Sequence, residues 1–238
     1  MRAVILAVLA FALAGCGAPV PAPAPQPAPP LIGADGRQTP RGAALQFLEV
    51  VARVEPVAEA VCRARGVARN CDIRIVVDDR PGQPPNAFQT VDRAGRPIVG
   101  FTLALIADAR NADEVAFVLG HEAAHHIAGH ILKQQEQAQS GALVAAVVAQ
   151  ANGLSPEQAR EAQLLGAEVA ALGYSKQFEL EADALGAEIA FLAGYDPIHG
   201  AEFFDRLPDP GDQFLGSHPP NAQRKAQVAA TVRRLTAS

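Results

Sequence analysis

The amino-acid sequence predicts an α+β fold that is mostly α-helical and carries one small β-sheet. Most of the 238-residue chain consists of segments in which apolar residues recur at helical spacing. The hydrophobic content is 49%, much of it alanine, and only 5% of the residues are aromatic, which favours closely packed helices over a large aromatic core. Only one region, before residue 103, has the β-branched and alternating patterns typical of strands. We therefore expect one domain, spanning residues 41–238.

The first part of this domain is predicted to contain one helix and three strands. Leucine, phenylalanine and valine recur at helical spacing in residues 41–65. Residues 71–79 form a β-branched run that predicts a strand. Residues 86–91 and 97–102 flank the sequence Asp-Arg-Ala-Gly, which is typical of a β-hairpin.

The remainder of the domain is predicted to be helical. Helices are expected at residues 103–110, from Asn111 to about Leu132, from Ser155-Pro156 to Gly173, from Ser175 to Phe191, from Pro197, and from Pro219-Pro220 to the C-terminus. Residues 141–151 are rich in alanine and valine but too short to span a membrane. They either pack as a helix or touch a lipid surface, and we favour packing because short apolar runs are usually core segments.

The N-terminal segment resembles the signal of an exported bacterial lipoprotein. Residues 1–15 carry one arginine followed by a short apolar run, and Leu-Ala-Gly before Cys16 looks like a lipobox. This predicts cleavage before Cys16 and lipidation of that cysteine; the alternative is an ordinary secretory signal with an incidental cysteine. Residue 17 is glycine rather than aspartate, so we expect an anchor in the outer membrane, facing the periplasm. Residues 16–40, rich in proline and alanine, would form a tether of polyproline type.

Charge and cysteine content narrow the function classes further. The formal net charge of −5 provides no basic surface, which argues against a nucleic-acid-binding function. Two cysteines remain besides Cys16, and in an oxidising compartment Cys62 and Cys71 are expected to form a disulfide between a helix and a strand. Two buried thiols are the alternative.

The motif H-E-x-x-H, formed by His121, Glu122 and His125, lies inside a predicted helix. At about 100° per residue, positions four apart lie on one helix face, so both imidazoles can bind one Zn²⁺. Glu122 is placed to take a proton from a water bound to that metal. A chance string on a helix surface is the alternative, since the chain has six histidines. On a continuous helix His126 and His130 face elsewhere, so we interpret them as surface or packing residues.

A catalytic zinc usually has three protein ligands, so a third ligand is required. Glu179 and Asp183 are four residues apart on one face of a later predicted helix. One carboxylate could bind the metal while the other orients a ligand imidazole through its second nitrogen. The alternative is an acidic, solvated helix face, which we expect for Glu181 and Glu188.

Three motifs in this order resemble a known peptidase family. They are H-E-x-x-H, the segment from Ser175 to Asp183, and His218-Pro219 followed by Arg224. Together they resemble the gluzincin metallopeptidases of family forty-eight, which include CAAX prenyl proteases, HtpX heat-shock proteases and periplasmic BepA-type proteases. The resemblance covers residues 41–238 and implies a zincin-like domain with a small sheet over the H-E-x-x-H helix. The membrane-spanning helices of the prenyl proteases and HtpX have no counterpart here, so the similarity is to the soluble, exported branch.

The resemblance also implies roles for individual residues. His121, His125 and Glu179 would bind one Zn²⁺ per chain, Glu122 would be the general base, and Asp183 would support a ligand.

For three further residues the resemblance leaves the role open. His218 would either approach the zinc as a fourth ligand or donate a hydrogen bond to the oxyanion, and a packed histidine before a helix is the third alternative. Arg224 and Tyr174 are further candidates for stabilising the oxyanion. Lys176 stands where the family commonly has arginine, which would weaken a structural contact but leaves the ligands untouched.

Together these features predict a zinc-dependent endopeptidase of the periplasm that cleaves unfolded or misassembled polypeptides in envelope quality control. Residues 97–102 would be an edge strand that accepts an extended substrate by β-augmentation. The rival hypothesis is a non-catalytic or latent zinc-binding chaperone or assembly factor for outer-membrane proteins, with an unidentified envelope partner. If His218 fills the fourth position, the zinc is four-coordinate and the resting protein nearly inert.

Overall fold

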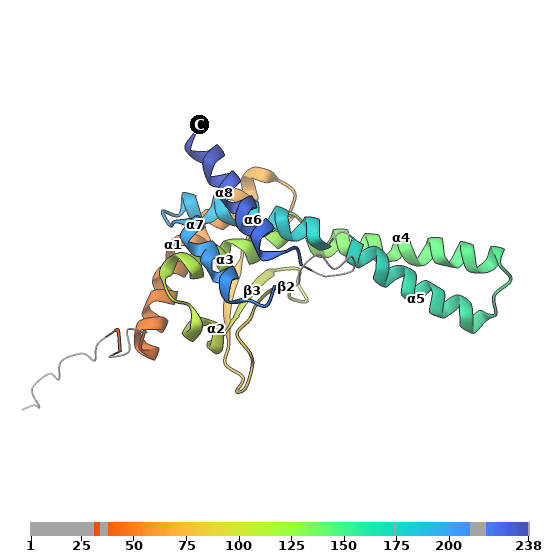
Figure 1. Ribbon diagram of the computed structural model, residues 1–238, viewed down its shortest axis with the longest axis horizontal. Coiled ribbons are helices and arrows are strands. Elements are labelled where there is room, and N and C mark those ends of the chain that lie inside the picture. Colours follow the sequence, from red (N-terminus) through yellow and green to blue (C-terminus); the bar gives the residue numbers. More distant parts are fainter. Residues whose placement is uncertain (1–30, 34–37, 174, 210–217, 238) are drawn as a thin grey trace, which may run out of the picture.

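The computed structural model describes residues 31–33, 38–173, 175–209 and 218–237. It consists of a body of helices packed with a small sheet, from which the helical hairpin of α4 and α5 projects (Figure 1). The α+β, mostly helical fold class predicted from the sequence is therefore confirmed. Within the described ranges, no helix is long and apolar enough to cross a membrane. Cys16, with the predicted signal and most of the predicted tether, lies outside the described residues.

The first helix, α1 (Pro40–Arg65), has clear signals at both ends. The Thr39 side chain accepts a hydrogen bond from the Gly42 amide at its start. At its end Gly66 adopts a left-handed conformation with φ of 64°, which glycine tolerates because it lacks a Cβ. Its buried face carries Phe47, and the ring of Phe47 meets that of Phe101 edge to face at 5.1 Å.

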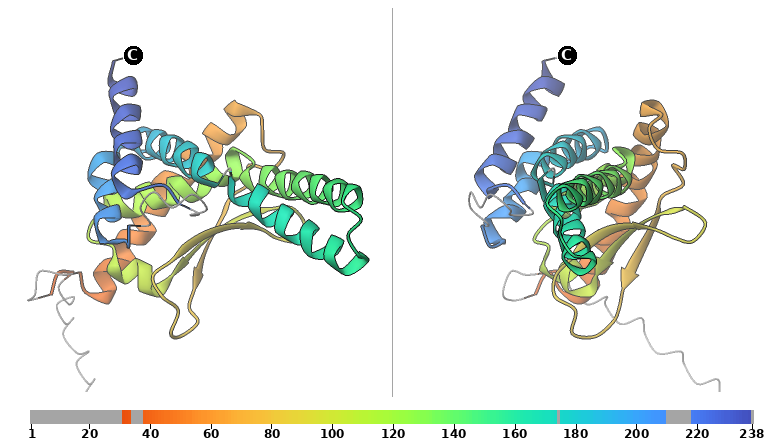
Figure 2. Two further views of the ribbon diagram at one scale, coloured as in Figure 1. Left: turned by 45° about the vertical axis from the view of Figure 1, so that its right-hand side comes forward. Right: turned by 90° about the vertical axis from the view of Figure 1, so that its right-hand side faces the viewer.

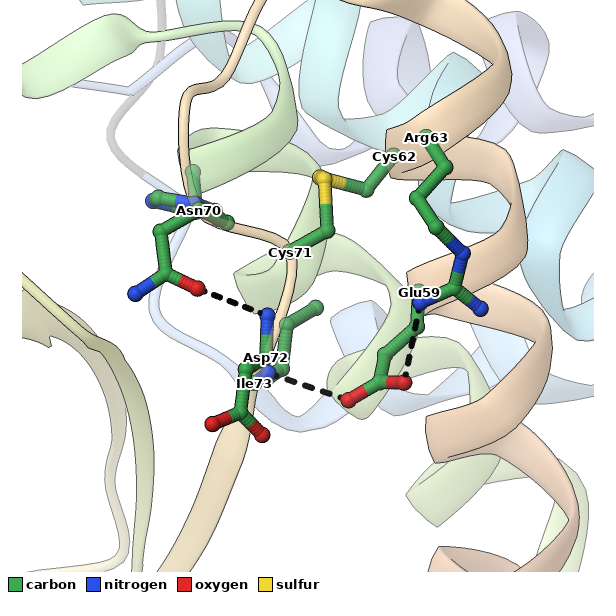
Figure 3. The surroundings of a disulfide bond; sticks show 8 residues. Glu59, Cys62, Arg63, Asn70, Cys71, Asp72 and Ile73 are labelled. Carbon is green, nitrogen blue, oxygen red and sulfur yellow. Dashed lines mark hydrogen bonds and ion pairs between the residues drawn. A yellow bond between two sulfur atoms is a disulfide. The ribbon is translucent and has the colours of Figure 1, made fainter.

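A disulfide joins the end of α1 to the segment that leads into the sheet (Figure 3). Cys62 and Cys71 are bridged with their Cα atoms 5.7 Å apart. One turn before Cys62, the Glu59 carboxylate accepts a hydrogen bond from the Ile73 amide and pairs with Arg63. The connection from helix to sheet is therefore fixed at two points.

The sheet has three strands, β1 (Arg74–Asp78), β2 (Ala87–Val91) and β3 (Pro97–Thr102), in the order β1-β3-β2. β3 pairs antiparallel with β2 across the predicted hairpin and parallel with β1. The expectation that residues 97–102 form an edge strand is therefore wrong, because β3 is central and all its residues except Ile98 are buried. A hairpin pattern identifies two partners but not the side on which an earlier strand joins them.

The helices that follow keep the predicted order with two changes. They are α2 (Leu103–Asp108), α3 (Ala112–Ile127), α4 (His130–Ala151), α5 (Pro156–Gly173), α6 (Ser175–Leu192), α7 (Pro197–Gly200), the 3₁₀ helix η1 (Ala201–Arg206) and α8 (Asn221–Thr236). The helix predicted from Asn111 to Leu132 instead ends at Ile127, because the chain turns at Gly129, which has φ of 70°. A new helix starts at His130 and absorbs the alanine- and valine-rich segment.

The centre of the body is the contact between α3 and α6, where two glycines face each other. A Cβ placed on Gly120 would lie 2.6 Å from the Gly186 carbonyl oxygen, and one on Gly186 would lie 2.6 Å from the His121 amide nitrogen. The two backbones approach this closely because neither residue has a side chain. This contact brings the H-E-x-x-H helix against the helix that carries Glu179 and Asp183.

Candidate metal centre

Two histidines of α3 and one glutamate of α6 converge on a common point. The Nε2 atoms of His121 and His125 are 3.1 Å apart, and the carboxylate oxygens of Glu179 lie 3.6 Å from the first and 3.4 Å from the second. Tetrahedral bonds of about 2.0–2.1 Å place ligand atoms about 3.3 Å apart, so these three side chains fit one zinc ion. Within the described ranges they are the one group of three or more histidine, cysteine or carboxylate side chains close enough to hold a metal.

The imidazole of His121 is oriented by a buried ion pair. Its Nδ1 lies 2.9 Å from a carboxylate oxygen of Asp183, a fully buried side chain. Arg224 of α8 donates to both oxygens of that carboxylate, at 2.8 Å from Nε and 2.7 Å from Nη2. The guanidinium also lies over the ring of Phe204, 4.0 Å from its centroid. Three elements, α3, α6 and α8, thus hold the ring that presents Nε2 to the metal.

His125 is held by a different chain of contacts, through His130. The Nδ1 atoms of His125 and His130 are 2.9 Å apart, and Nε2 of His130 lies 3.2 Å from Glu181. The His130 ring is only 4% exposed and stacks on Phe178 with centroids 4.6 Å apart. If His125 binds a metal through Nε2, its Nδ1 carries the proton and donates it to His130, which then donates to Glu181.

His130 is a packed residue, as expected, but this contact corrects the expectation that it faces away from the metal ligands. On a continuous helix His130 lies on the side opposite His121, but α3 ends at Ile127 and the turn at Gly129 resets the direction of the chain. The glycine was the signal that could have revealed the break. His126, by contrast, does face away from the centre, with Nε2 only 2.6 Å from the Asn70 carbonyl oxygen.

Glu122 lies between two cavities that flank the candidate metal position. One cavity of about 310 Å³ is lined by Ala87, Glu122, His218 and Arg224 among others, and a second of about 220 Å³ by Gln89, Glu122 and Phe178. Both also contact His125 and Glu179. Since Ala87 and Gln89 belong to β2, the open surface beside Glu122 follows the edge of the sheet.

The protonation states of two of the three ligands, His125 and Glu179, suit a cation. Burial, followed by the neighbouring His121, lowers the pKa of His125 to about 3, so this imidazole is neutral at physiological pH. Burial alone would raise the pKa of Glu179, but a hydrogen bond from His218 and the charges of His121 and Arg224 hold it well below its ordinary value. Burial raises the pKa of Glu122. A neutral imidazole and an ionised carboxylate are the forms that bind Zn²⁺.

The structure places His218 and Arg224 against the same carboxylate. Nδ1 of His218 is 3.1 Å from Glu179, and Nη2 of Arg224 is 3.2 Å from it. His218 remains 54% exposed at the mouth of the cavity, whereas Arg224 is buried. Tyr174, the third residue considered for the oxyanion, lies outside the described residues.

Comparison with known proteins agrees with this geometry. No curated protein matches the chain. The sequence profile described as Peptidase family M48 matches residues 47–232, which include α3, α6 and most of α8. The chain therefore belongs to peptidase family M48, a family of metallopeptidases that typically depend on zinc.

Proposed function

We propose that this protein is a zinc-dependent endopeptidase that cleaves extended segments of unfolded or misassembled polypeptides. The observation that carries the proposal is the convergence of His121, His125 and Glu179 beside Glu122, in a cleft that follows the edge strand β2. Three protein ligands leave one position of a tetrahedral zinc for water or substrate, as in catalytic rather than structural sites.

The residues of the centre have distinct tasks in this reaction. Zn²⁺, when bound by His121, His125 and Glu179, supplies Lewis acidity toward water and the scissile carbonyl. Glu122 accepts a proton from the attacking water and returns it to the leaving amine, which balances the hydrolysis. Arg224 faces Asp183 and Glu179, so it supports the ligands. The exposed ring of His218 is the group that can donate to the developing oxyanion or cover the open position.

The position of β2 supports an extended substrate. β2 lies at the edge of the sheet and pairs only with β3 among the described strands, so a peptide can add to its free side by backbone hydrogen bonds. Its residues Ala87 and Gln89 line the cavities on either side of Glu122. An unfolded segment has free backbone groups for this pairing, whereas most backbone groups of a folded protein are already paired.

The setting we propose is the bacterial periplasm, with a lipid anchor at Cys16 in the outer membrane and a role in envelope quality control. This part of the proposal rests on the lipobox-like sequence before Cys16 and the Pro/Ala-rich residues after it. The disulfide between Cys62 and Cys71 is compatible with an oxidising compartment.

A latent or non-catalytic zinc-binding chaperone is the second candidate, and one observation favours it. His218 already bonds to Glu179 at the mouth of the cavity, within reach of a position that covers the metal. A histidine in that place would make zinc four-coordinate and suppress cleavage.

Cleavage of unfolded casein, measured together with zinc content, separates these functions. A peptidase binds about one zinc per chain and cleaves casein, and Glu122→Gln keeps the zinc but abolishes cleavage. If the enzyme is latent, His218→Ala cleaves faster than wild type. Zinc binding without cleavage that depends on Glu122, in both wild type and His218→Ala, would contradict the peptidase and support the chaperone.

A further inference from the structure

The hairpin formed by α4 and α5 exposes large apolar side chains far from the core. It extends away from the body, as Figure 1 and the left view of Figure 2 show. Large apolar residues that are 42–67% exposed occur along both helices: Leu143, Val144, Val147, Val148, Leu164, Leu165 and Val169. Apolar surface gathered in this way on a soluble protein marks an interaction site.

The two helices of the hairpin contact each other through small residues. A Cβ on Gly141 would lie 2.2 Å from the Gly166 carbonyl oxygen, and one on Gly166 would lie 2.7 Å from the Cβ of Ala145. Ala149, two turns after Gly141, is the one fully buried side chain of this half of α4. The alanine- and valine-rich segment therefore does pack as a helix, as expected, but its valines and leucine point outward.

Four of the outward residues share one face. Val144 and Leu165 precede the touching residues Ala145 and Gly166 by one position, and Val148 and Val169 follow them by three. At about 100° per residue, Val144 and Leu165 each lie about 100° around their helix from the line along which the two helices touch. Val148 and Val169 lie about 60° from that line, on the same side. Because the helices are antiparallel, equal offsets fall on the same side of the pair, so these four residues form one surface, here called the apolar face.

The side of α5 that points away from α4 is acidic. Leu164 lies two positions before Gly166, about 160° from the contact line, and Glu157, Glu168 and Glu161 follow it around the helix at about 180°, 200° and 220°. No charged residue occurs from Gln137 to Pro156, a stretch that covers the second half of α4 and the tip of the hairpin. Acidic residues thus line the outward side of α5, next to the apolar face that α5 shares with the uncharged second half of α4.

This arrangement is the reverse of helix packing in water. A hairpin surrounded by water buries its large apolar residues between the helices, because their removal from water stabilises the pair. Helices surrounded by lipid have no such driving force and pack through glycine and alanine, with large apolar residues turned outward. The α4–α5 contact follows the second pattern on every turn from Gly141 to Ala149.

We propose that the apolar face of the α4–α5 hairpin docks on the surface of a lipid bilayer. Val144, Val148, Leu165 and Val169 enter the interface between headgroups and acyl chains, and the glutamates of α5 remain in water. Lipid is the expected occupant because the two helices touch through small residues and turn their large apolar side chains outward, as helices in lipid do. This docking depends on neither zinc nor cleavage, so its failure and that of the proposed peptidase are distinguishable.

Flotation with neutral phosphatidylcholine vesicles tests the docking. The protein is the chain from residue 16 onward with Cys16→Ser, so that no acyl group contributes to binding. We expect it to float with the vesicles and to remain bound in high salt, because the segment that enters the interface carries no charge. Replacing an apolar side chain that enters the interface weakens vesicle partitioning by about tenfold, so Val144→Gln with Leu165→Gln loses most of the binding.

Leu164→Gln is the matched control. Leu164 is 66% exposed and its neighbour Leu165 61%, so both exchanges leave the fold intact, but only Leu165 belongs to the apolar face. We expect Leu164→Gln to float like the parent. Absence of parent flotation, or an equal loss in Leu164→Gln, overturns the proposal. Size-exclusion chromatography with light scattering, done in parallel, assigns the face to a second copy if the parent is a dimer and the double variant a monomer, which also overturns it.

Discussion

Two pairs of helices in this molecule meet through facing glycines, but one contact is buried at the candidate metal centre and the other lies in the exposed hairpin. In the body, Gly120 and Gly186 bring α3 against α6, and the residues around them are buried and bonded. In the hairpin, Gly141 and Gly166 bring α4 against α5, and the large side chains around them are exposed. Where further elements cover such a glycine contact, as in the body, it holds the metal-binding side chains in place. Where no element of the described chain covers it, as in the hairpin, the large side chains form an exposed surface. Substitutions in the α3–α6 contact should therefore weaken zinc binding, and substitutions in the α4–α5 contact should not.

The largest effect is expected from the buried ion pair of the body. Arg224→Met removes the cation that pairs with the fully buried Asp183 carboxylate and leaves it only His121, which should lower the free energy of unfolding by about 3–5 kcal/mol. The adjacent Lys225→Met removes only the exposed pair with Asp205 and should cost less than about 1 kcal/mol. Denaturant unfolding of both variants measures the difference. Equal losses in the two variants would mean that the buried Arg224–Asp183 pair contributes no more to the free energy of unfolding than an exposed pair does.

Enlarging a glycine in each contact tests the comparison itself. Gly186→Val places a side chain against the His121 backbone and should destabilise the body by about 1–3 kcal/mol or more, with loss of zinc affinity. Gly166→Val forces α4 and α5 apart with a similar clash but should leave zinc affinity unchanged. Zinc titration and thermal unfolding of both variants give the answer. Loss of zinc in Gly166→Val would show that the hairpin and the centre are coupled.

His130 offers a finer test within the centre. His130→Phe keeps a ring stacked on Phe178 but removes the acceptor for His125, so zinc should bind about 10- to 100-fold more weakly. Competition with a chromophoric chelator measures the affinity, and unfolding of the metal-free protein should change little. His126→Phe is the matched control, because His126 bonds to Asn70 away from the centre. An unchanged zinc affinity in His130→Phe would reduce His130 to a packing residue.

The smallest effect is a pH dependence at the rim of the body. The hydrogen bond to Asp113 raises the pKa of His199 above its ordinary value of 6.5. A raised pKa in the folded protein means that the pair stabilises the fold at low pH and that this contribution disappears as pH rises through the raised value. The midpoint of thermal unfolding should therefore differ between wild type and His199→Gln at acidic pH and converge at alkaline pH. The difference should be small because His199 is exposed.

The sequence predicts the class of fold and most helices because their signals are local. Asn111 does cap α3 by accepting from the Glu114 amide, and Ser155 does accept from the Gln158 amide at the start of α5. The spacing of His121 and His125 likewise follows from the geometry of one helix.

The errors concern relations between distant segments. The place of β3 in the sheet depends on a parallel pairing with β1, which no local pattern encodes. The approach of His130 to His125 depends on how the chain turns at Gly129 and on where Phe178, far along the chain, offers a ring to stack on. The exposed hairpin was missed for a related reason, because an apolar run has the same periodicity whether its large residues face inward or outward.

The central claim is that His121, His125 and Glu179 hold a zinc ion that Glu122 uses for peptide hydrolysis. The most direct measurement is zinc content and casein cleavage in the same samples of three proteins. All three carry His218→Ala, which leaves the site open; the first has no other change, the second adds Glu122→Gln and the third adds Glu179→Gln. The account predicts cleavage only in the sample with intact Glu122 and Glu179, with zinc retained in Glu122→Gln and lost in Glu179→Gln. Cleavage that survives in Glu122→Gln, or zinc bound equally well without Glu179, would contradict it.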